Sequence, residues 1–307
     1  MTAEDLRAIP GRVGLWSMEL RSAGQAEVRD AASELDGLGF RALWIPGGDG
    51  TRVFGDLGWL LQAAPHTAVA LGVLGIWGYD PAEVGEHLNA LDRAYGPRAI
   101  LGFGVSSAAS AAAAGREYGD PVTSVAAYLD RLDAAVHPVP FARRVLGALG
   151  PKMAALGARR AAGLHPFLVT PDYSARVRAR IGAGPVIAPH QAVVLDTDPA
   201  RARAAARDGI GMVIGFPAYQ NNLRRLGFTD DDLVPGGSDR LIDAVVAWGT
   251  VDDIRRRVQA HLDAGADHVA LHVLGGHGDL PLPQWRQLAE LLPSTVGGRA
   301  QRMRGNP

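Results

Sequence analysis

The sequence contains no cysteine, which excludes disulfide bonds, thiolate metal sites and cysteine nucleophiles. It also lacks an excess of either charge, because 31 Lys and Arg residues balance 32 Asp and Glu residues to a formal net charge of -1. Without such an excess, no overall field draws the chain to nucleic acid or to an anionic membrane surface. We therefore expect a small molecule as its partner, and neither a nucleic acid nor a membrane.

Long apolar runs are missing as well. No stretch of about 18 apolar residues occurs, and the opening residues lack the basic and apolar regions of a secretory signal. We therefore expect a cytoplasmic protein without a membrane span. What the chain does contain is 47% hydrophobic and 21% charged residues, which is enough apolar material for a large core.

The chain repeats a unit in which an amphipathic helix ends at glycine and a short apolar strand follows. In the clearest copy, Thr250 caps a helix that has Asp253 in its first turn, Gly265 supplies the left-handed end, and the strand HVALHVL follows. The first helix ends in the same way at Gly39, before the strand FRALWIP. The two copies read alike, LDGLGFRALWI and LDAGADHVALHV, which indicates equivalent positions in one architecture.

Eight apolar strands are predicted, with helices between them. We place the strands at residues 12–17, 40–46, 67–76, 98–106, 144–149, 164–169, 190–195 and 268–274. Besides the two helices just described, we place helices at residues 56–64, 81–95, 122–134, 151–162, 172–181 and 199–208. Near-continuous apolar strands that alternate with helices are typical of a parallel sheet covered on its outside, and eight such units close a (β/α)8 TIM-like barrel.

Three segments depart from the simple repeat. Residues 209–249 precede the last helix and strand and include a further helical segment, SDRLIDAVVAWG, so we expect an insertion at the barrel mouth. The Ala-rich run at 108–114 is either a helix or a loop. The tail at 297–307 is expected to be flexible. Because α/β barrels of roughly 250 residues fold as one domain, we expect residues 1–296 to form a single barrel domain.

The loop after the fourth strand has features of a ligand site. Enzymes of this architecture place their site where the carboxyl ends of the strands meet. In GFGVSS, Gly102 and Gly104 let the backbone approach a ligand closely, and Ser106 and Ser107 supply hydroxyls at the strand end.

The loop after the fifth strand, GALGPKM, has complementary features. Gly147 and Gly150 loosen the turn, Pro151 suits the first helical position, and the helix N-terminus with Lys152 offers N–H groups and positive charge to an anion. The two loops together read as a phosphate or pyrophosphate cradle. Neither is a P-loop or a dinucleotide fingerprint, so ordinary turn glycines are the alternative.

The third strand ends in LGVLGIWGYDP, with Gly72 and Gly75 inside an apolar run. Glycine within a strand marks a bulge or a close backbone approach, or else a simple kink. Trp16, Trp44 and Trp77 fall near the carboxyl ends of the first three strands, where indoles would offer a flat substrate a stacking surface. The alternative is that at least one of them packs beneath the helices.

No acid–base, metal or nucleophile constellation emerges from the remaining residues. His190 alternates with apolar residues on the seventh strand and is placed to face the interior. His268 and His272 share one face of the eighth strand, but no further ligands occur at matching spacing, so we predict no metal. A GxSxG elbow is also absent. Hydride transfer from a bound coenzyme needs little from side chains and fits these residues.

In their order along the chain, the motifs resemble the luciferase-like monooxygenase superfamily, and within it the coenzyme F420-dependent oxidoreductases. The resemblance runs from Val13 to about Leu292. It is carried by LWIP (43–46), IWGYDPAEV (76–84), LGFGVS (101–106), VLGALGPKM (145–153), HPFLVTPDY (165–173), APHQAVVLDTDPARAR (188–203), NNLRRLGFTDDDL (221–233), GGSDRLIDAVVAWG (236–249) and AHLDAGADHVALHVL (260–274).

This resemblance implies a barrel of the bacterial luciferase type with an insertion region before the last helix-strand unit. It implies that a non-prolyl cis peptide bulge in the third strand supports the coenzyme ring, and by position that bond joins Gly72 to Val73. It places the coenzyme phosphate at the ends of strands four and five. The matching residues are Gly104, Ser106, Ser107, Ala148, Leu149, Gly150, Pro151, Lys152 and Met153.

The chain also departs from its relatives. Gly47 and Gly48 stand where relatives often have an acidic residue after LWIP, and His190 replaces the glutamate of PEQAVVL. The histidine near strand two that is typical of sugar-phosphate-oxidising relatives is not visible. The resemblance therefore does not identify the substrate, for which we expect contacts from Trp16, Trp44, Trp77 and His190.

Three functions remain open. The resemblance implies a homodimeric oxidoreductase that moves a hydride between coenzyme F420 and a small organic substrate. The alternative within the family is FMN-dependent monooxygenation, because both coenzymes share a ring and a ribityl phosphate. The alternative of another class is a barrel that binds an anionic ligand without redox activity.

Overall fold

The computed structural model of the chain describes residues 11–48, 52–275 and 278–293. Within these residues ten strands form one all-parallel sheet in the order β7-β6-β5-β4-β3-β2-β1-β10-β8-β9. Their bounds are β1 Val13–Trp16, β2 Ala42–Ile45, β3 Ala68–Gly75, β4 Ala99–Gly104, β5 Arg144–Leu146, β6 Gly163–Leu164, β7 Val186–Ile187, β8 His190–Val194, β9 Val246–Trp248 and β10 Val269–Val273.

The sheet closes into a barrel through the short segment that joins β7 to β8. On one side of this segment, the Ala188 N–H donates to the Leu164 carbonyl in β6 at 2.9 Å. On the other side, the Ala270 N–H in β10 donates to the Pro189 carbonyl, also at 2.9 Å. The segment therefore joins β7 and β8 into one bent strand that closes the barrel. The eight-unit barrel predicted from the sequence is confirmed.

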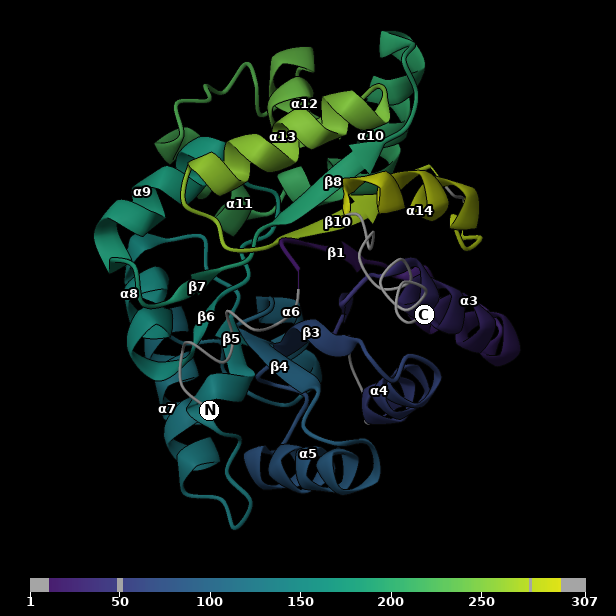
Figure 1. The fold of residues 1–307 in the computed structure, drawn as a ribbon. Coiled ribbons are helices and arrows are strands. Elements are labelled where there is room, and N and C mark those ends of the chain that lie inside the picture. Colours follow the sequence, from purple (N-terminus) through teal and green to yellow (C-terminus); the bar gives the residue numbers. More distant parts are fainter. Residues whose placement is uncertain (1–10, 49–51, 276–277, 294–307) are drawn as a thin grey trace, which may run out of the picture.

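Helices surround the strands on the outside of the barrel (Figure 1). They are α2 Glu19–Ser22, α3 Gln25–Leu38, α4 Arg52–Ala63, α5 Pro81–Tyr95, α6 Ala108–Ala113, α7 Pro121–Asp133, α8 Pro151–Arg160, α9 Pro171–Ile181, α10 Pro199–Ile214, α11 Pro217–Arg225, α12 Asp239–Val245, α13 Val251–Asp263 and α14 Leu282–Leu288, with 3-10 turns at Phe141–Arg143 and Ala289–Leu291. None of the helices described here is long and apolar enough to cross a membrane.

The end signals in the repeated unit are confirmed. Thr250 and Asp253 form a reciprocal capping box at the start of α13, because each side chain accepts the backbone N–H of the other residue. Gly265 and Gly39 have φ values of +94° and +101°, the left-handed conformation that glycine adopts most easily.

Several predicted boundaries are wrong. The strand expected at 144–149 ends at Leu146, and the helix expected at 56–64 begins at Arg52. The strand expected at 164–169 covers only Gly163–Leu164, since Pro166 has no N–H to donate and Leu168 has a φ of +54°. The helix expected at the end of the insertion stops at Val245, and Val246–Trp248 instead form β9, which pairs with β8. The helix expected at 199–208 continues to Ile214. The Ala-rich run is helical as α6, and the tail at 297–307 lies outside the described residues.

Apolar residues form three clusters. The main one lies between the strands and the surrounding helices, and a small one fills the barrel interior. The third packs α10, α11 and α12 of the insertion against β8 and includes Ile210, Leu223 and Ile242. The insertion is thus held by apolar packing of its own, next to the strand that completes the barrel.

Two helix glycines allow a test of this packing. A Cβ at Gly55 in α4 would meet nothing within 4 Å, whereas a Cβ at Gly85 in α5 would lie 1.8 Å from the His137 carbonyl oxygen. We expect Gly55→Ala to stabilise the fold by about 0.5 to 1 kcal/mol, because alanine favours helix. We expect Gly85→Ala to destabilise it by about 1 to 3 kcal/mol, because α5 must shift. Urea unfolding of both variants measures this, and equal effects would contradict the geometry.

Candidate functional site

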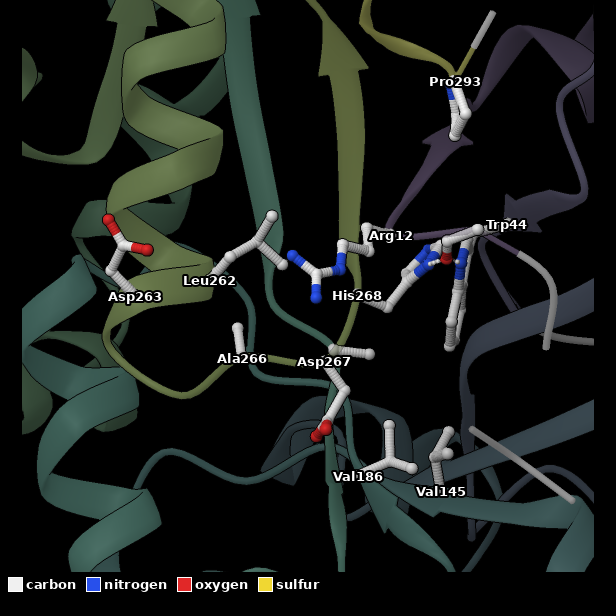
Figure 2. Close-up of a pocket in the computed structure, with 12 residues that line it drawn as sticks. Arg12, Trp44, Val145, Val186, Leu262, Asp263, Ala266, Asp267, His268 and Pro293 are labelled. Atoms are coloured by element: carbon white, nitrogen blue, oxygen red, sulfur yellow. Dashed lines mark hydrogen bonds between the residues drawn. The ribbon is translucent and has the colours of Figure 1, made fainter. Parts of the chain in front are cut away.

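A cavity of about 620 Å³ opens at the amino end of the strands (Figure 2). Arg12 precedes β1, Asp267 and His268 precede β10, and Val186 begins β7, so this cavity lies at the opposite end from the predicted site. Figure 2 shows the Arg12 side chain extending between Leu262 and the indole of Trp44. Barrel enzymes carry their chemistry at the other end, where the strands reach their carboxyl ends.

Trp44 does not lie where the sequence placed it. Its side chain is 1% exposed, and its indole N–H donates to His268 Nε2 at 3.1 Å. The indole also stacks on His165 with ring centroids 4.2 Å apart and lines the amino-end cavity. The expected substrate contact at Trp44 is therefore wrong, because this ring fills the barrel interior.

The opposite end, which we call the carboxyl rim, is where the strands reach their last residues. Here β3 carries a bulge, since its register with β4 shifts between Leu71 and Leu74. The peptide bond between Gly72 and Val73 is cis, as the resemblance implied. Gly72 and Val73 are half-buried although the strands beside them are buried, so the bulge faces the rim.

Three glycines make room for the Val73 side chain. A Cβ at Gly102 or Gly104 would lie 2.7 or 2.8 Å from a Val73 methyl carbon, and one at Gly147 would lie 3.3 Å away. A Cβ at Gly102 would also lie 2.1 Å from the Leu71 carbonyl oxygen. We had expected Gly102 and Gly104 to admit a ligand, but what they admit is the bulge of the neighbouring strand.

The two glycines after LWIP are explained by the same bulge. A Cβ at Gly47 would lie 2.3 Å from the Val73 carbonyl oxygen, and Gly48 forms a β-bridge with Leu74. Arg21 holds this turn, because its Nη1 donates to the carbonyls of Pro46 and Gly47 at 2.9 Å each. At this position glycine makes the close approach of β3 possible.

The loop after β4 presents hydroxyl groups to solvent at the rim. Ser106 has a φ of +56°, and Ser107 caps α6 by accepting the Ser110 N–H at 3.1 Å. Both serines are exposed. Trp77 lies beside this loop, half-buried, with its indole N–H donating to the Val105 carbonyl.

The loop after β5 leads into α8 with unpaired donors. Gly150 is the N-cap of α8 and makes no side-chain capping bond, so the backbone N–H groups of Lys152 and Met153 are available to an anion. Lys152 is exposed and is the only lysine in the chain. The Tyr173 hydroxyl donates to the Ala148 carbonyl and holds the start of the loop in place. Leu149 is half-buried beside it, and Pro151 begins the helix.

The two loops are neighbours in space. Phe103 in β4 is in register with Leu146 in β5, and the Gly147 N–H donates to the Phe103 carbonyl at 2.9 Å. The serine hydroxyls and the free end of α8 therefore lie side by side at the carboxyl rim, next to the bulge.

A pair of buried histidines lies across the rim from the glycines. His190 Nε2 and His272 Nδ1 are 3.0 Å apart, and Phe167 stacks on His190 with ring centroids 3.6 Å apart. Trp16 connects this pair to the bulge, since its ring lies 4.5 Å from that of His272 and its N–H donates to the Gly72 carbonyl at 3.2 Å. His190 faces the interior, as predicted. Phe167 was not predicted as a site residue, because it lies in a segment that the apolar pattern assigned to a strand.

Two of these interior imidazoles keep one nitrogen without a partner. His190 Nδ1 and His165 Nε2 are buried, and neither has a hydrogen-bond partner. A Cβ at Gly72 would lie 2.6 Å from His165 Nε2, so this nitrogen points to the bulge. Burial lowers the pKa of His165 and of His272 to about 4 and lowers that of His190 as well, with the charge of His272 adding to the effect at His190. The imidazoles at this site are therefore neutral at pH 7.

Because these imidazoles are buried, we predict that acid destabilises the fold. Burial also lowers the pKa of His268 to about 4 and that of His261 to about 3, against about 6.5 in the unfolded chain. The unfolded chain therefore binds more protons, so this stability is fully present above about pH 6.5 and is lost as the pH falls toward 4.

Urea unfolding between pH 7.5 and 5 measures this loss. His268→Gln keeps an acceptor for Trp44 and should reduce the slope of unfolding free energy against pH by about 1 kcal/mol per unit near pH 5. His137→Gln changes an exposed position and is the matched control. A wild-type stability that does not change over this range would contradict the prediction.

Comparison with known proteins identifies the family. The profile of the family described as luciferase-like monooxygenase matches residues 10–268. No curated protein sequence matches the chain.

Solved structures share the fold at low sequence identity. An F420-dependent secondary alcohol dehydrogenase in complex with an F420-acetone adduct has a TM-score of 0.70 at 14% identity, over 92% of this chain and 98% of the other. The coenzyme F420-dependent tetrahydromethanopterin reductase from Methanopyrus kandleri has a TM-score of 0.69 at 17% identity, over 92% and 96%. The oxygenating constituent of 3,6-diketocamphane monooxygenase from Pseudomonas putida, in complex with FMN, has a TM-score of 0.65 at 13% identity, over 91% and 96%.

The family profile covers most of the chain, from before β1 to the start of β10. The solved structures agree with it, because they share the closed parallel barrel over nearly their whole length. The chain therefore belongs to the luciferase-like monooxygenase family and is an oxidoreductase of that family.

Proposed function

We propose that this chain is a coenzyme F420-dependent oxidoreductase that transfers a hydride between the deazaflavin and a small organic substrate at the carboxyl rim. The proposal rests on one observation: three features lie next to each other at one end of the barrel. These are the half-buried bulge of β3, the serine hydroxyls after β4 and the uncapped start of α8 after β5. A planar ring with a phosphorylated side chain matches them in this order.

The residues at the rim fit such a coenzyme. Gly72 and Val73 would lie beneath the ring, while Gly104, Ser106 and Ser107 would hold the chain that leads to the phosphate. The phosphate would lie at the start of α8, where free N–H groups and an ammonium group favour an anion. The residues there are Ala148, Leu149, Gly150, Pro151, Lys152 and Met153.

The choice of F420 over FMN follows the resemblance, which is to the coenzyme F420-dependent oxidoreductases within the superfamily. Two structures with this fold are described as F420-dependent, and a third contains FMN. FMN-dependent oxygenation is thus the second candidate, since FMN has a comparable ring and phosphate.

When bound, the coenzyme supplies or accepts the hydride, and the chain must then handle a proton. When neutral His190 carries its proton at Nε2, this N–H donates to Nδ1 of His272. Nδ1 of His190 is then a free acceptor. A substrate hydroxyl at this atom could pass its proton to His190 as the hydride leaves its carbon. Trp77, which is half-buried, would contact the substrate beside the bulge, whereas Trp16 is 4% exposed and would hold His272 and the bulge from within the interior cluster.

Coenzyme titration tests the proposal. We expect the fluorescence of F420 to be quenched when the protein binds it, and we expect F420 to bind more tightly than FMN. Tighter binding of FMN would make FMN-dependent oxygenation the first candidate. Lys152→Glu combined with Gly150→Trp should weaken binding at least tenfold, because it adds charge repulsion and bulk to the cradle. Arg159→Glu, near the other end of α8, is the control. Unchanged affinity in the Lys152/Gly150 variant would show that the phosphate binds elsewhere.

The single lysine offers a second measurement. An amine-selective acylating reagent should label Lys152 and the chain N-terminus, and peptide mass spectrometry separates the two. Bound coenzyme should protect Lys152 and leave the labelling of the N-terminus unchanged. Equal labelling of Lys152 with and without saturating coenzyme would contradict its place in the cradle.

The proton acceptor is tested separately. His190→Phe keeps a ring against Phe167 but removes the free Nδ1, so we expect kcat to fall about 100-fold or more while the Kd of the coenzyme changes less than threefold. His268→Gln alters a buried imidazole at the amino end of the same barrel and should retain kcat. Full turnover in His190→Phe would exclude His190 as the acceptor.

We also propose that the protein works in the cytoplasm as a homodimer. The proposal rests on the resemblance, because members of this family are commonly dimers. Sedimentation equilibrium should give twice the mass of one chain, and a single-chain mass at micromolar concentration would refute the dimer.

A further inference from the structure

The insertion brings a cation to the start of α8. A Cβ at Gly150 would lie 3.9 Å from Nη2 of Arg225, the last residue of α11. The Arg176 side chain donates to the Arg225 carbonyl, which joins the end of α11 to α9. Burial raises the pKa of Tyr173, and the charge of Arg225 opposes this rise. The Arg225 charge is therefore close to Tyr173, whose hydroxyl donates to the Ala148 carbonyl.

The charge of Arg225 is available to a ligand. The neighbouring Arg224 makes an ion pair with Asp230 at 2.9 Å. Among the described residues Arg225 makes no ion pair with a carboxylate, and it is exposed. Arg225, Lys152 and the free N–H groups of α8 thus put positive charge on both sides of Gly150. The Asp120 carboxylate, whose pKa is lowered by hydrogen bonds from Thr123 and also by the Lys152 charge, is an acidic group on the Lys152 side.

A second polar group on α11 is also unpartnered. Asn222 is 3% exposed, and its Nδ2 has no hydrogen-bond partner. Tyr219, Asn222 and Arg225 are three residues apart, so they share one face of the helix, with Asn222 in the middle. Tyr219 meets Phe167 of the rim with ring centroids 6.3 Å apart, and Arg225 meets the Gly150 loop. Along α11, Asn222 therefore lies between the residue that meets Phe167 and the residue that meets Gly150.

We propose that Arg225 is a phosphate-binding residue, which the insertion places opposite the start of α8, and that Asn222 donates a hydrogen bond to the same bound molecule. The guanidinium group would grip two phosphate oxygens while the N–H groups of Lys152 and Met153 bind a third. This inference rests on the proposed function, because the phosphate belongs to the coenzyme. The inference adds to the proposed function that residues of the insertion bind the coenzyme.

The test compares each coenzyme with its form that lacks the phosphate. Dissociation constants are measured by fluorescence titration for FMN and riboflavin, and for F420 and its deazariboflavin core, which lacks the phosphate and the tail attached to it. We expect Arg225→Ala to weaken binding of the phosphorylated forms about 10- to 100-fold, while the phosphate-free forms change less than twofold. Arg225→Lys should retain part of the affinity, because it keeps the charge without the fork.

Arg224→Ala is the matched control, since Arg224 is on the same helix turn but is paired with Asp230. Thermal unfolding of each variant checks that the insertion still folds. Equal losses with and without the phosphate, or no loss in Arg225→Ala, would overturn the role of Arg225 and leave the proposed function standing. A wild-type protein that binds neither F420 nor FMN would overturn both.

Discussion

The carboxyl rim depends on the contact between the Val73 side chain and the glycines of the next two strands. The bulge of β3 moves this side chain out of the ordinary pleat, and Gly102, Gly104 and Gly147 leave the space that it enters. Gly47 allows the same backbone to pass on the other side. Because backbone atoms lie within 2.5 Å of the Cβ positions at Gly47 and Gly102, side chains there would push the bulge back. The glycines at this end thus shape a surface inside the protein.

Around this surface the rim divides into two halves of different chemistry. The half formed by β3, β4 and β5 has glycines, hydroxyls, free N–H groups and the only lysine of the chain. The half formed by β8 and β10 has neutral imidazoles and aromatic rings. Such a division suits a reaction in which one side of the site holds a phosphorylated coenzyme and the other side receives a proton.

Much of this arrangement could be predicted from the sequence, and the parts that failed have physical reasons. Strand and helix positions followed from apolar patterning and from end signals such as Thr250 and Gly265, which act locally. The resemblance placed the bond between Gly72 and Val73, which is confirmed. The position of Trp44 could not be predicted, since the side on which a long ring leaves a strand depends on partners such as His268, which are distant in sequence. The proximity of Arg225 to Gly150 could not be predicted either, because the two residues are far apart in the sequence and only the folded insertion brings them together.

The bent strand that closes the barrel has a further consequence. Its first part, β7, pairs with β6, and its second part, β8, pairs with β10 and with β9 at the end of the insertion. His190 is the first residue of β8 and pairs with Ala270 of β10. The proton acceptor that we propose therefore lies on the strand with which the edge strand of the insertion, β9, pairs. Contacts of the insertion with a bound molecule would therefore act on the same strand that carries the imidazole, which links the two halves of the rim through backbone hydrogen bonds.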